Sequence, residues 1–160
     1  MTAALEDTLY LDVPAGRVVI ELRPDLAPNH VARIKELARE GFYDGVKFHR
    51  VIPGFMAQTG CPLGNGTGGS GKKLRAEFSA ERHVRGICSM ARTNDPNSAD
   101  SQFFIMFGNS PHLDNQYTVW GKVVSGMEHI DAIKTGDRSS GSVADPDKIV
   151  KLQVAADAAA

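Results

Sequence analysis

Residues 48–58 read Phe-His-Arg-Val-Ile-Pro-Gly-Phe-Met-Ala-Gln, the most informative stretch of the chain. It places one permanent cation, Arg50, and one amide, Gln58, among bulky apolar side chains, with a Pro53-Gly54 turn between them. It contains no serine, cysteine or carboxylate that could act as a nucleophile or base. Such a site can hold an uncharged apolar group and polarise it. That suits a reaction in which no covalent bond is made or broken.

The sequence on both sides of this stretch predicts short β-strands. Several runs are apolar or alternate with a period of two, and turn residues such as Pro14-Ala15-Gly16 separate them. The expected strands are Thr8–Val13, Arg17–Leu22, Lys47–Ile52, Met56–Thr59, Ile87–Ala91, Gln102–Phe107, Thr118–Val124 and Lys148–Val154. Many short strands and few helices predict a mainly β fold: a closed eight-stranded antiparallel β-barrel capped by two α-helices.

Two segments have helical spacing. From Asn29, taken as the N-cap, apolar residues recur every three or four positions until Gly41. A second, short helix is expected from Met127 and should end at Gly136. Trp120 stands in a strand pattern, so we expect it to pack inside the barrel and not in a binding site.

Length and composition indicate one ordinary globular domain. The chain has 160 residues, 42% hydrophobic and 23% charged, and a formal net charge of -1. We expect a single domain over residues 1–160, with a core at about 8–155 and a frayed tail at 156–160. Nothing in this charge balance predicts binding to nucleic acid or membranes, and the near-zero charge favours a monomer.

The two cysteines, Cys61 and Cys88, cannot form a disulfide framework and are expected to be free thiols, as in a reducing compartment. Residues 1–7 carry acids where a signal peptide has basic residues and an apolar run. No stretch approaches the length of a transmembrane helix. These features predict a cytoplasmic protein.

One glycine-rich segment imitates nucleotide-binding motifs. Gly64–Gly69 matches G-x-G-x-x-G, and residues 66–73 nearly match a P-loop. Both motifs need a strand before the glycines and a helix after them, which this sequence does not predict. A nucleotide enzyme is therefore the third alternative. The histidines and cysteines lack metal-site spacing, so we expect neither a metal nor a cofactor.

Three segments resemble the signature segments of the cyclophilins, which are peptidyl-prolyl cis-trans isomerases: residues 48–58, Asn65–Gly69 and Ser101–Ile105. The resemblance extends in order over about residues 8–155. It implies an eight-stranded barrel with a peptide groove on its outside. It also implies accelerated rotation about X-Pro bonds in peptides and in unfolded or folding proteins, the expected partners.

The resemblance implies that Arg50 is catalytic and that Gln58 assists it by holding the substrate backbone. It places large apolar residues around the proline ring and assigns backbone contacts to Gln102 and to the main chain at Arg92. The implied substrate-binding residues are Phe55, Met56, Gly66, Ala91, Arg92, Thr93, Gln102, Phe104, His112, Leu113 and Tyr117.

Three positions depart from the best-known eukaryotic pattern. Arg92-Thr93 replaces Asn-Ala, His112 replaces tryptophan and Tyr117 replaces histidine. Because the tryptophan helps to bind cyclosporin in the family, we expect weakened cyclosporin binding here. Arg92 adds a charge at the rim, which we expect to alter the preference for residues flanking proline. The short connection over residues 40–47 resembles compact bacterial forms.

One alternative from another functional class stays open. The same barrel could hold proline-containing segments without isomerising them, as a non-catalytic binding module. Arg50 argues against it, because simple binding does not need a guanidinium among apolar side chains. Binding without acceleration in an isomerisation assay would support the module.

Overall fold

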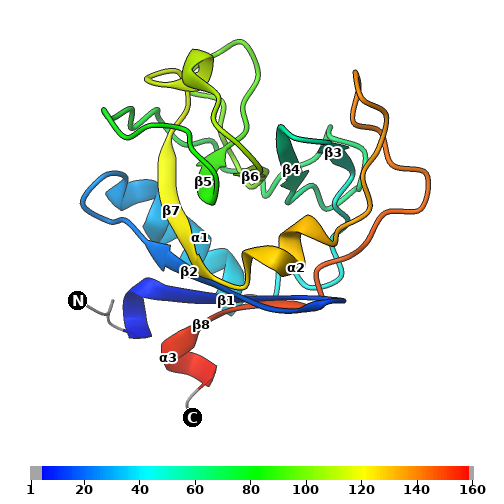
Figure 1. Cartoon of the computed structure of the whole chain (residues 1–160). Helices are drawn as coiled ribbons and strands as arrows, with labels where there is room; N and C mark the ends of the chain where they lie inside the picture. The colour runs from blue at the N-terminus through cyan, green and yellow to red at the C-terminus, as the bar shows by residue number, and fades with distance from the viewer. Residues whose placement is uncertain (1–4, 159–160) are drawn as a thin grey trace.

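The computed structural model describes residues 5–158, so part of the N-terminal stretch taken as evidence against a signal peptide lies outside the described residues. Eight strands dominate the chain (Figure 1). They are β1 (Thr8–Val13), β2 (Gly16–Leu22), β3 (Arg50–Ile52), β4 (Met56–Thr59), β5 (Ile87–Met90), β6 (Phe103–Met106), β7 (Val119–Ser125) and β8 (Lys151–Val154).

All eight strands form one antiparallel sheet in the order β3-β4-β6-β5-β7-β2-β1-β8. The sheet curls into a half-barrel (Figure 1). The predicted eight antiparallel strands are confirmed, but the predicted closure is not. The ladder ends at β3 and β8, and a single bridge between Lys47 and Lys148 links the segments that precede these two edges.

The same contact explains why two predicted strands are shorter than expected. Lys47–Ile52 is reduced to β3, and Lys148–Val154 is reduced to β8. The remaining residues hydrogen-bond across the gap between the edges, as when Phe48 N donates to the carbonyl of Asp147. They therefore belong to no continuous ladder.

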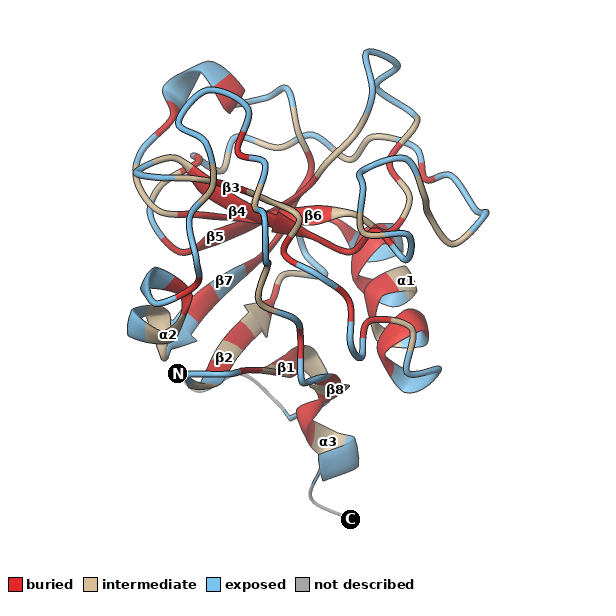
Figure 2. Cartoon of the chain, turned by 90° about the vertical axis from the view of Figure 1, so that its right-hand side faces the viewer, coloured by how far each residue is buried: buried red, intermediate tan, exposed pale blue. Residues whose placement is uncertain are grey.

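Three α-helices accompany the sheet in the described residues, where two were predicted. α1 (Pro28–Arg39) packs against β7 and β8, and α2 (Met127–Asp131) packs against β2. Figure 2 shows the buried face of α1 turned towards the sheet. The third, α3 (Ala155–Ala158), occupies most of the predicted tail, and residues 159–160 lie outside the described part of the chain. Two 3-10 turns, η1 (Leu5–Asp7) and η2 (Pro111–Leu113), complete the fold.

The prediction that Asn29 caps α1 is wrong. The N-cap is Ala27, two residues earlier, and the helix starts at Pro28, where the missing proline N–H costs nothing. A distant carboxylate replaces the local cap: Glu77 accepts hydrogen bonds from the backbone N–H groups of Asn29 and His30, at 3.2 and 2.9 Å. A negative charge is favourable at this end of a helix.

Both faces of the sheet are covered by apolar side chains. In β6, Phe103 and Ile105 point into the main core, where Trp120 is also fully buried as predicted. The intervening residues, Phe104 and Met106, belong to a second cluster on the outer face. This outer cluster consists of Met56, Ile87, Phe104, Met106, Leu113 and Val119.

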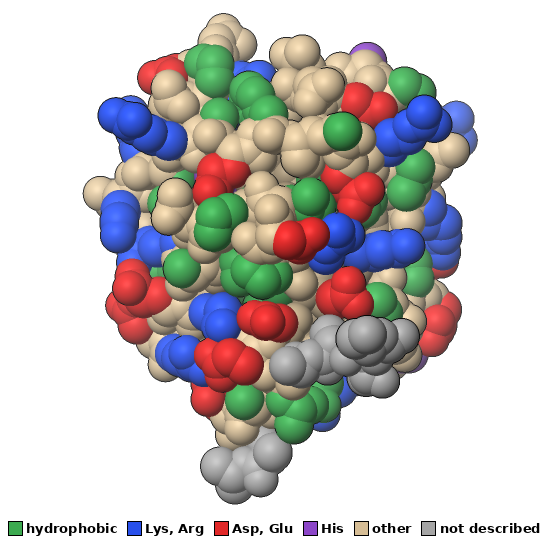
Figure 3. All heavy atoms as spheres, turned by 90° about the vertical axis from the view of Figure 1, so that its left-hand side faces the viewer, with side chains coloured by type: hydrophobic (Ala, Val, Ile, Leu, Met, Phe, Trp, Pro, Cys, Tyr) green, Lys and Arg blue, Asp and Glu red, His purple; other side chains and the backbone are tan. Residues whose placement is uncertain are grey.

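The surface carries charges of both signs. Figure 3 shows lysines and arginines interspersed with acidic residues over one face of the molecule. Within residues 5–158, no helix has the length and apolarity needed to cross a membrane.

Candidate active site

The register of three neighbouring strands brings the predicted catalytic residues together. Arg50 of β3 pairs with Gln58 of β4, and Gln58 pairs with Phe104 of β6. Directly opposed residues point to the same face of a sheet. All three side chains therefore lie on the outer face, while the adjacent Val51 and Ala57 enter the core.

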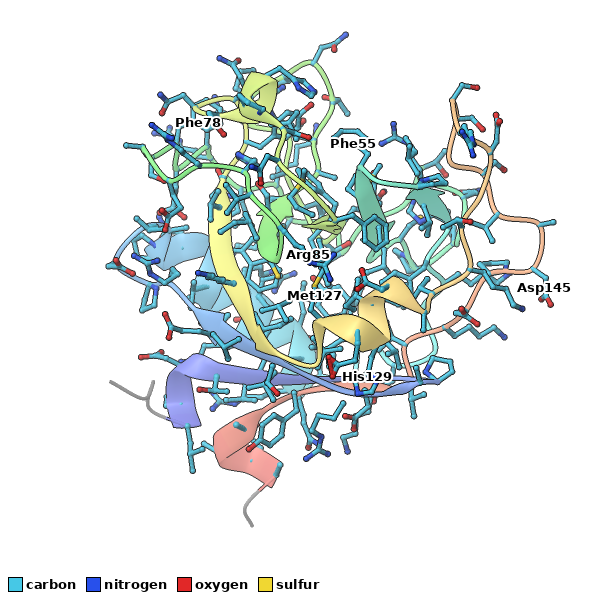
Figure 4. All side chains as sticks on the ribbon, in the orientation of Figure 1. Phe55, Phe78, Arg85, Met127, His129 and Asp145 are labelled. Carbon is cyan, nitrogen blue, oxygen red and sulfur yellow. The ribbon has the colours of Figure 1, made fainter. Side chains whose placement is uncertain are left out.

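A pocket of about 320 Å³, here called the apolar pocket, opens above these residues. Aromatic rings form part of its walls: Phe104 and Tyr117 meet edge to face at 5.6 Å, and Phe55 lies 5.9 Å from the ring of His112. Phe55 lies at the end of the molecule opposite to β1 and β8 (Figure 4). The pocket is lined by Arg50, Phe55, Met56, Gln58, Ala91, Arg92, Phe104, His112, Leu113 and Tyr117.

A second pocket of about 270 Å³, the glycine-loop pocket, adjoins the first. The two pockets share Gln58, Ala91 and Arg92. The glycine-loop pocket is lined by Gln58, Gly66, Thr67, Gly68, Gly69, Lys73, Ala91, Arg92, Thr93, Ser98, Asp100 and Gln102. Each predicted site residue therefore lines one pocket or the other.

Arg50 is held by two hydrogen bonds of different kinds. Its Nη1 donates to Gln58 Oε1 at 3.0 Å, and its Nε donates to the carbonyl of Ser140 at 3.2 Å. The second terminal nitrogen, Nη2, has no hydrogen-bond partner within residues 5–158. The guanidinium is thus fixed in orientation at the pocket and keeps donor capacity for a bound group.

The amides of Gln58 and Gln102 continue this chain of hydrogen bonds. Gln58 Nε2 donates to Gln102 Oε1 at 3.0 Å. Gln102 Nε2 donates to the carbonyls of Gly66 and Gly68, each at 2.9 Å. The Arg50 side of the apolar pocket is therefore linked to the glycine-rich loop by a chain of hydrogen bonds.

The glycine-rich loop folds around the sulfur atom of Cys61. Residues 61–86 contain no helix, which removes the structural basis of the P-loop alternative. The buried Cys61 Sγ accepts a hydrogen bond from Gly68 N at 3.2 Å. Burial alone would raise the pKa of Cys61, but backbone N–H groups from Asn65, Gly68 and Gly66 hold it below its usual value. Both cysteines are free thiols, as predicted.

A buried polar cluster, which the sequence patterns did not predict, supports the aromatic wall. His83 lies in hydrogen-bond distance of Asp114 (3.3 Å) and Ser89 (2.9 Å), and its ring stacks on Phe104 at 6.1 Å. Burial lowers the pKa of His83, although Asp114 opposes the shift. Ser89 and His83 are 0% and 1% exposed, so this serine cannot attack a substrate. The cluster therefore holds His83 against Phe104 and fixes the position of the aromatic wall.

Several residues of the glycine-loop pocket also have no signal in the sequence patterns. Lys73, Ser98 and Asp100 come from irregular segments. Their side-chain directions follow no period of two or 3.6, so strand and helix patterns carry no signal for them.

Comparisons with known proteins agree with this geometry. The model of the family "Cyclophilin type peptidyl-prolyl cis-trans isomerase/CLD" matches residues 8–154. A "Probable peptidyl-prolyl cis-trans isomerase" of Brucella suis biovar 1 (strain 1330) is 57% identical over an alignment of 165 positions that covers 95% of this chain and 84% of the relative. "Peptidyl-prolyl cis-trans isomerase B" of Bacillus subtilis (strain 168) is 46% identical, covering 80% of this chain and 90% of the relative.

Solved structures agree as well. Cyclophilin AquaCyp293 from Hirschia baltica superposes with a TM-score of 0.88 at 29% identity, covering 98% of this chain and 77% of that one. A Cryptosporidium parvum cyclophilin, crystallised in the presence of the dipeptide Ala-Pro, gives 0.85 at 28% identity, covering 92% and 98%. The chain belongs to the cyclophilin-type peptidyl-prolyl cis-trans isomerase family. Its activity is prolyl isomerisation, as the resemblance implied.

Proposed function

We propose that Arg50 catalyses this isomerisation by donating a hydrogen bond to the twisted imide of an X-Pro bond whose proline ring occupies the apolar pocket. The substrates are proline-containing peptides and folding proteins. The observation that carries the proposal is the fixed guanidinium at the edge of an aromatic-lined pocket. No covalent bond forms or breaks at any step.

The chemistry needs one well-placed donor. Rotation about a peptide bond faces a barrier of about 18–20 kcal/mol, because resonance makes the C–N bond partly double. As the bond twists, the proline nitrogen becomes pyramidal and regains a lone pair. A donor aimed at that lone pair stabilises the twisted state more than either planar isomer, which is the condition for raising the rate.

The surroundings of Arg50 suit this task. Arginine stays protonated at any ordinary pH. The bonds to Gln58 and to the Ser140 carbonyl hold its plane in place, so little reorganisation is needed when substrate binds. Aromatic walls exclude water from the bound ring and strengthen the hydrogen bond to the imide. Gln58, in turn, can hold the substrate backbone beside the bond that rotates.

The test is the Arg50→Ala variant in an isomerisation assay on a short X-Pro peptide. We expect a folded protein that loses on the order of 2–4 kcal/mol of transition-state stabilisation, by analogy with a lost oxyanion donor. Arg75→Ala is the matched control, because Arg75 is exposed and lines neither pocket. Near-normal kcat/KM in a folded Arg50→Ala protein would refute the assignment.

We further propose a cytoplasmic monomer with weakened cyclosporin binding. Two free thiols support a reducing compartment. His112 offers a smaller apolar face than the tryptophan of the eukaryotic pattern, which supports the weakened binding. Gel filtration tests the monomer, cell fractionation tests the cytoplasmic location, and a cyclosporin titration tests the weakened binding.

A further inference from the structure

Arg92 is a second immobilised cation, located where the two pockets meet. Its Nε donates to the carbonyl of Gln116 at 2.9 Å, and its Nη1 donates to that of Thr93 at 2.8 Å. The guanidinium also lies 4.7 Å from the ring of Tyr117 and 6.0 Å from that of Phe78. These hydrogen bonds and ring contacts hold the guanidinium in one place. Both hydrogen-bond acceptors are backbone carbonyls, so neither neutralises its charge.

The glycine-loop pocket has an excess of positive charge. Lys73 joins Arg92 in its lining, and Asp100 is the sole carboxylate among the described residues that line it. That carboxylate is already engaged: it accepts hydrogen bonds from the backbone N–H groups of Ser70 and Gly71, at 2.7 and 3.1 Å. It therefore binds the loop and leaves the two cations available to a ligand.

The position of this pocket ties it to the residues next to proline. Because the pockets share Gln58, Ala91 and Arg92, a chain that leaves the apolar pocket across these residues enters the glycine-loop pocket at once. An extended chain advances about 3.3–3.6 Å per residue. A side chain one or two positions from a proline in the apolar pocket would therefore enter the pocket that Lys73 and Arg92 line. Phe78, near Arg92, and Phe55, in the apolar pocket, both lie at the end of the molecule opposite to β1 and β8 (Figure 4).

We propose that the glycine-loop pocket selects substrates with a carboxylate side chain within two residues of the proline. The inference rests on the proposed function, since it requires the proline to occupy the apolar pocket. Arginine suits the role because its planar fork matches a carboxylate. The cations lie beside the reacting bond and not on it, so the selection acts on KM more than on kcat.

The expected size of the preference for acidic peptides depends on how exposed the two cations are to solvent. Lys73 is exposed and Arg92 is only partly buried, so water and salt screen their attraction for a ligand. Pairs of this kind change an equilibrium by a few-fold. We expect about a three- to tenfold preference for the acidic peptide at low ionic strength, which decreases as salt is added.

The experiment compares matched peptides in a protease-free exchange assay. Each pair carries Glu or Gln at one of the two positions before or the two positions after the proline. The unmodified protein should turn over the Glu peptide with the lower KM at one of these positions at least. Lys73→Gln and Arg92→Gln should each reduce the Glu/Gln ratio, and Arg92→Glu should invert it. Lys72→Gln is the matched control, because Lys72 precedes Lys73 but does not line the pocket.

Two results would overturn the inference. One is equal KM for Glu and Gln at all four positions in the unmodified protein. The other is a Lys72→Gln variant that reduces the ratio as much as Lys73→Gln, since the preference would then come from the overall charge. Failure of the proposed function looks different: activity would then be unchanged by Arg50→Ala, whatever the flanking residue.

Discussion

At the scale of the residue, the site depends on which face of β3 and β4 each side chain occupies. Arg50 and Gln58 face outwards, and their neighbours Val51 and Ala57 are fully buried. A one-residue slip in the register would exchange the two sets. It would bury an uncompensated guanidinium in the core, at a large cost in free energy. The core thus enforces the direction of the Arg50 side chain.

A pH prediction belongs to this scale. Because the proposed donor is an arginine and no acid–base pair takes part, kcat/KM should change by less than about twofold between pH 6 and 8, where only histidine normally titrates. Burial lowers the pKa of His83, the histidine behind the aromatic wall, so it adds little titration there. A steep bell-shaped profile over this range would contradict the mechanism. The measurement is exchange kinetics on an uncharged peptide.

At the scale of the element, the glycine-rich loop owes its shape to a few side chains. Cys61 accepts from Gly68 N, and Asn65 Oδ1 accepts from the N–H and the hydroxyl of Thr67. These contacts turn the carbonyls of Gly66 and Gly68 towards Gln102. A loop without secondary structure is thereby held against the strand that carries the site.

Cys61→Ala should loosen this loop, because it removes the acceptor of the Gly68 N–H. We expect a loss on the order of 1 kcal/mol in local stability. Hydrogen exchange at Gly68 should accelerate, while exchange in β1 and β2 stays unchanged. Cys61→Ser keeps an acceptor and is the matched control. Unaltered exchange at Gly68 in the alanine variant would show that the sulfur does not organise the loop.

At the scale of the whole molecule, three histidines make folding sensitive to acid. Burial lowers the pKa of His30, His49 and His83 below the ordinary value near 6.5. The unfolded chain therefore binds more protons than the folded one below about pH 6.5. This contribution to stability is complete above that pH and decreases as the pH falls towards the folded-state pKa values.

Urea unfolding should accordingly show a lower midpoint at pH 5.5 than at pH 7.5. The carboxylates with lowered pKa values, such as Asp131 beside Arg85, lose their contribution only at more acidic pH, so the two effects separate. His83→Gln retains hydrogen-bonding groups but cannot titrate in this range, and its midpoint should depend less on pH. Stability that increased on acidification from pH 7.5 to 5.5 would contradict this assignment.

The strand and helix patterns predicted most elements because those elements are periodic. The hairpin of β1 and β2 follows from local alternation, and the strand β4 and the core position of Trp120 follow from short apolar runs next to turn residues. The N-terminus of α1 did not, since Glu77 caps it from more than 40 residues away. Local sequence contains no trace of such a partner.

The features of the candidate site also fall into those that the sequence predicted and those that it did not. From the sequence, the resemblance of residues 48–58 to a family signature segment was what assigned Arg50 and Gln58 to one site, and the register of β3 and β4 then placed them on one face. Only the tertiary structure decided that His83 would support the aromatic wall, that Lys73 and Arg92 would meet in one pocket, and that the sheet would stay open between β3 and β8. These features depend on non-periodic segments and on contacts between distant residues. Packing of the whole chain sets their geometry, and no local pattern does.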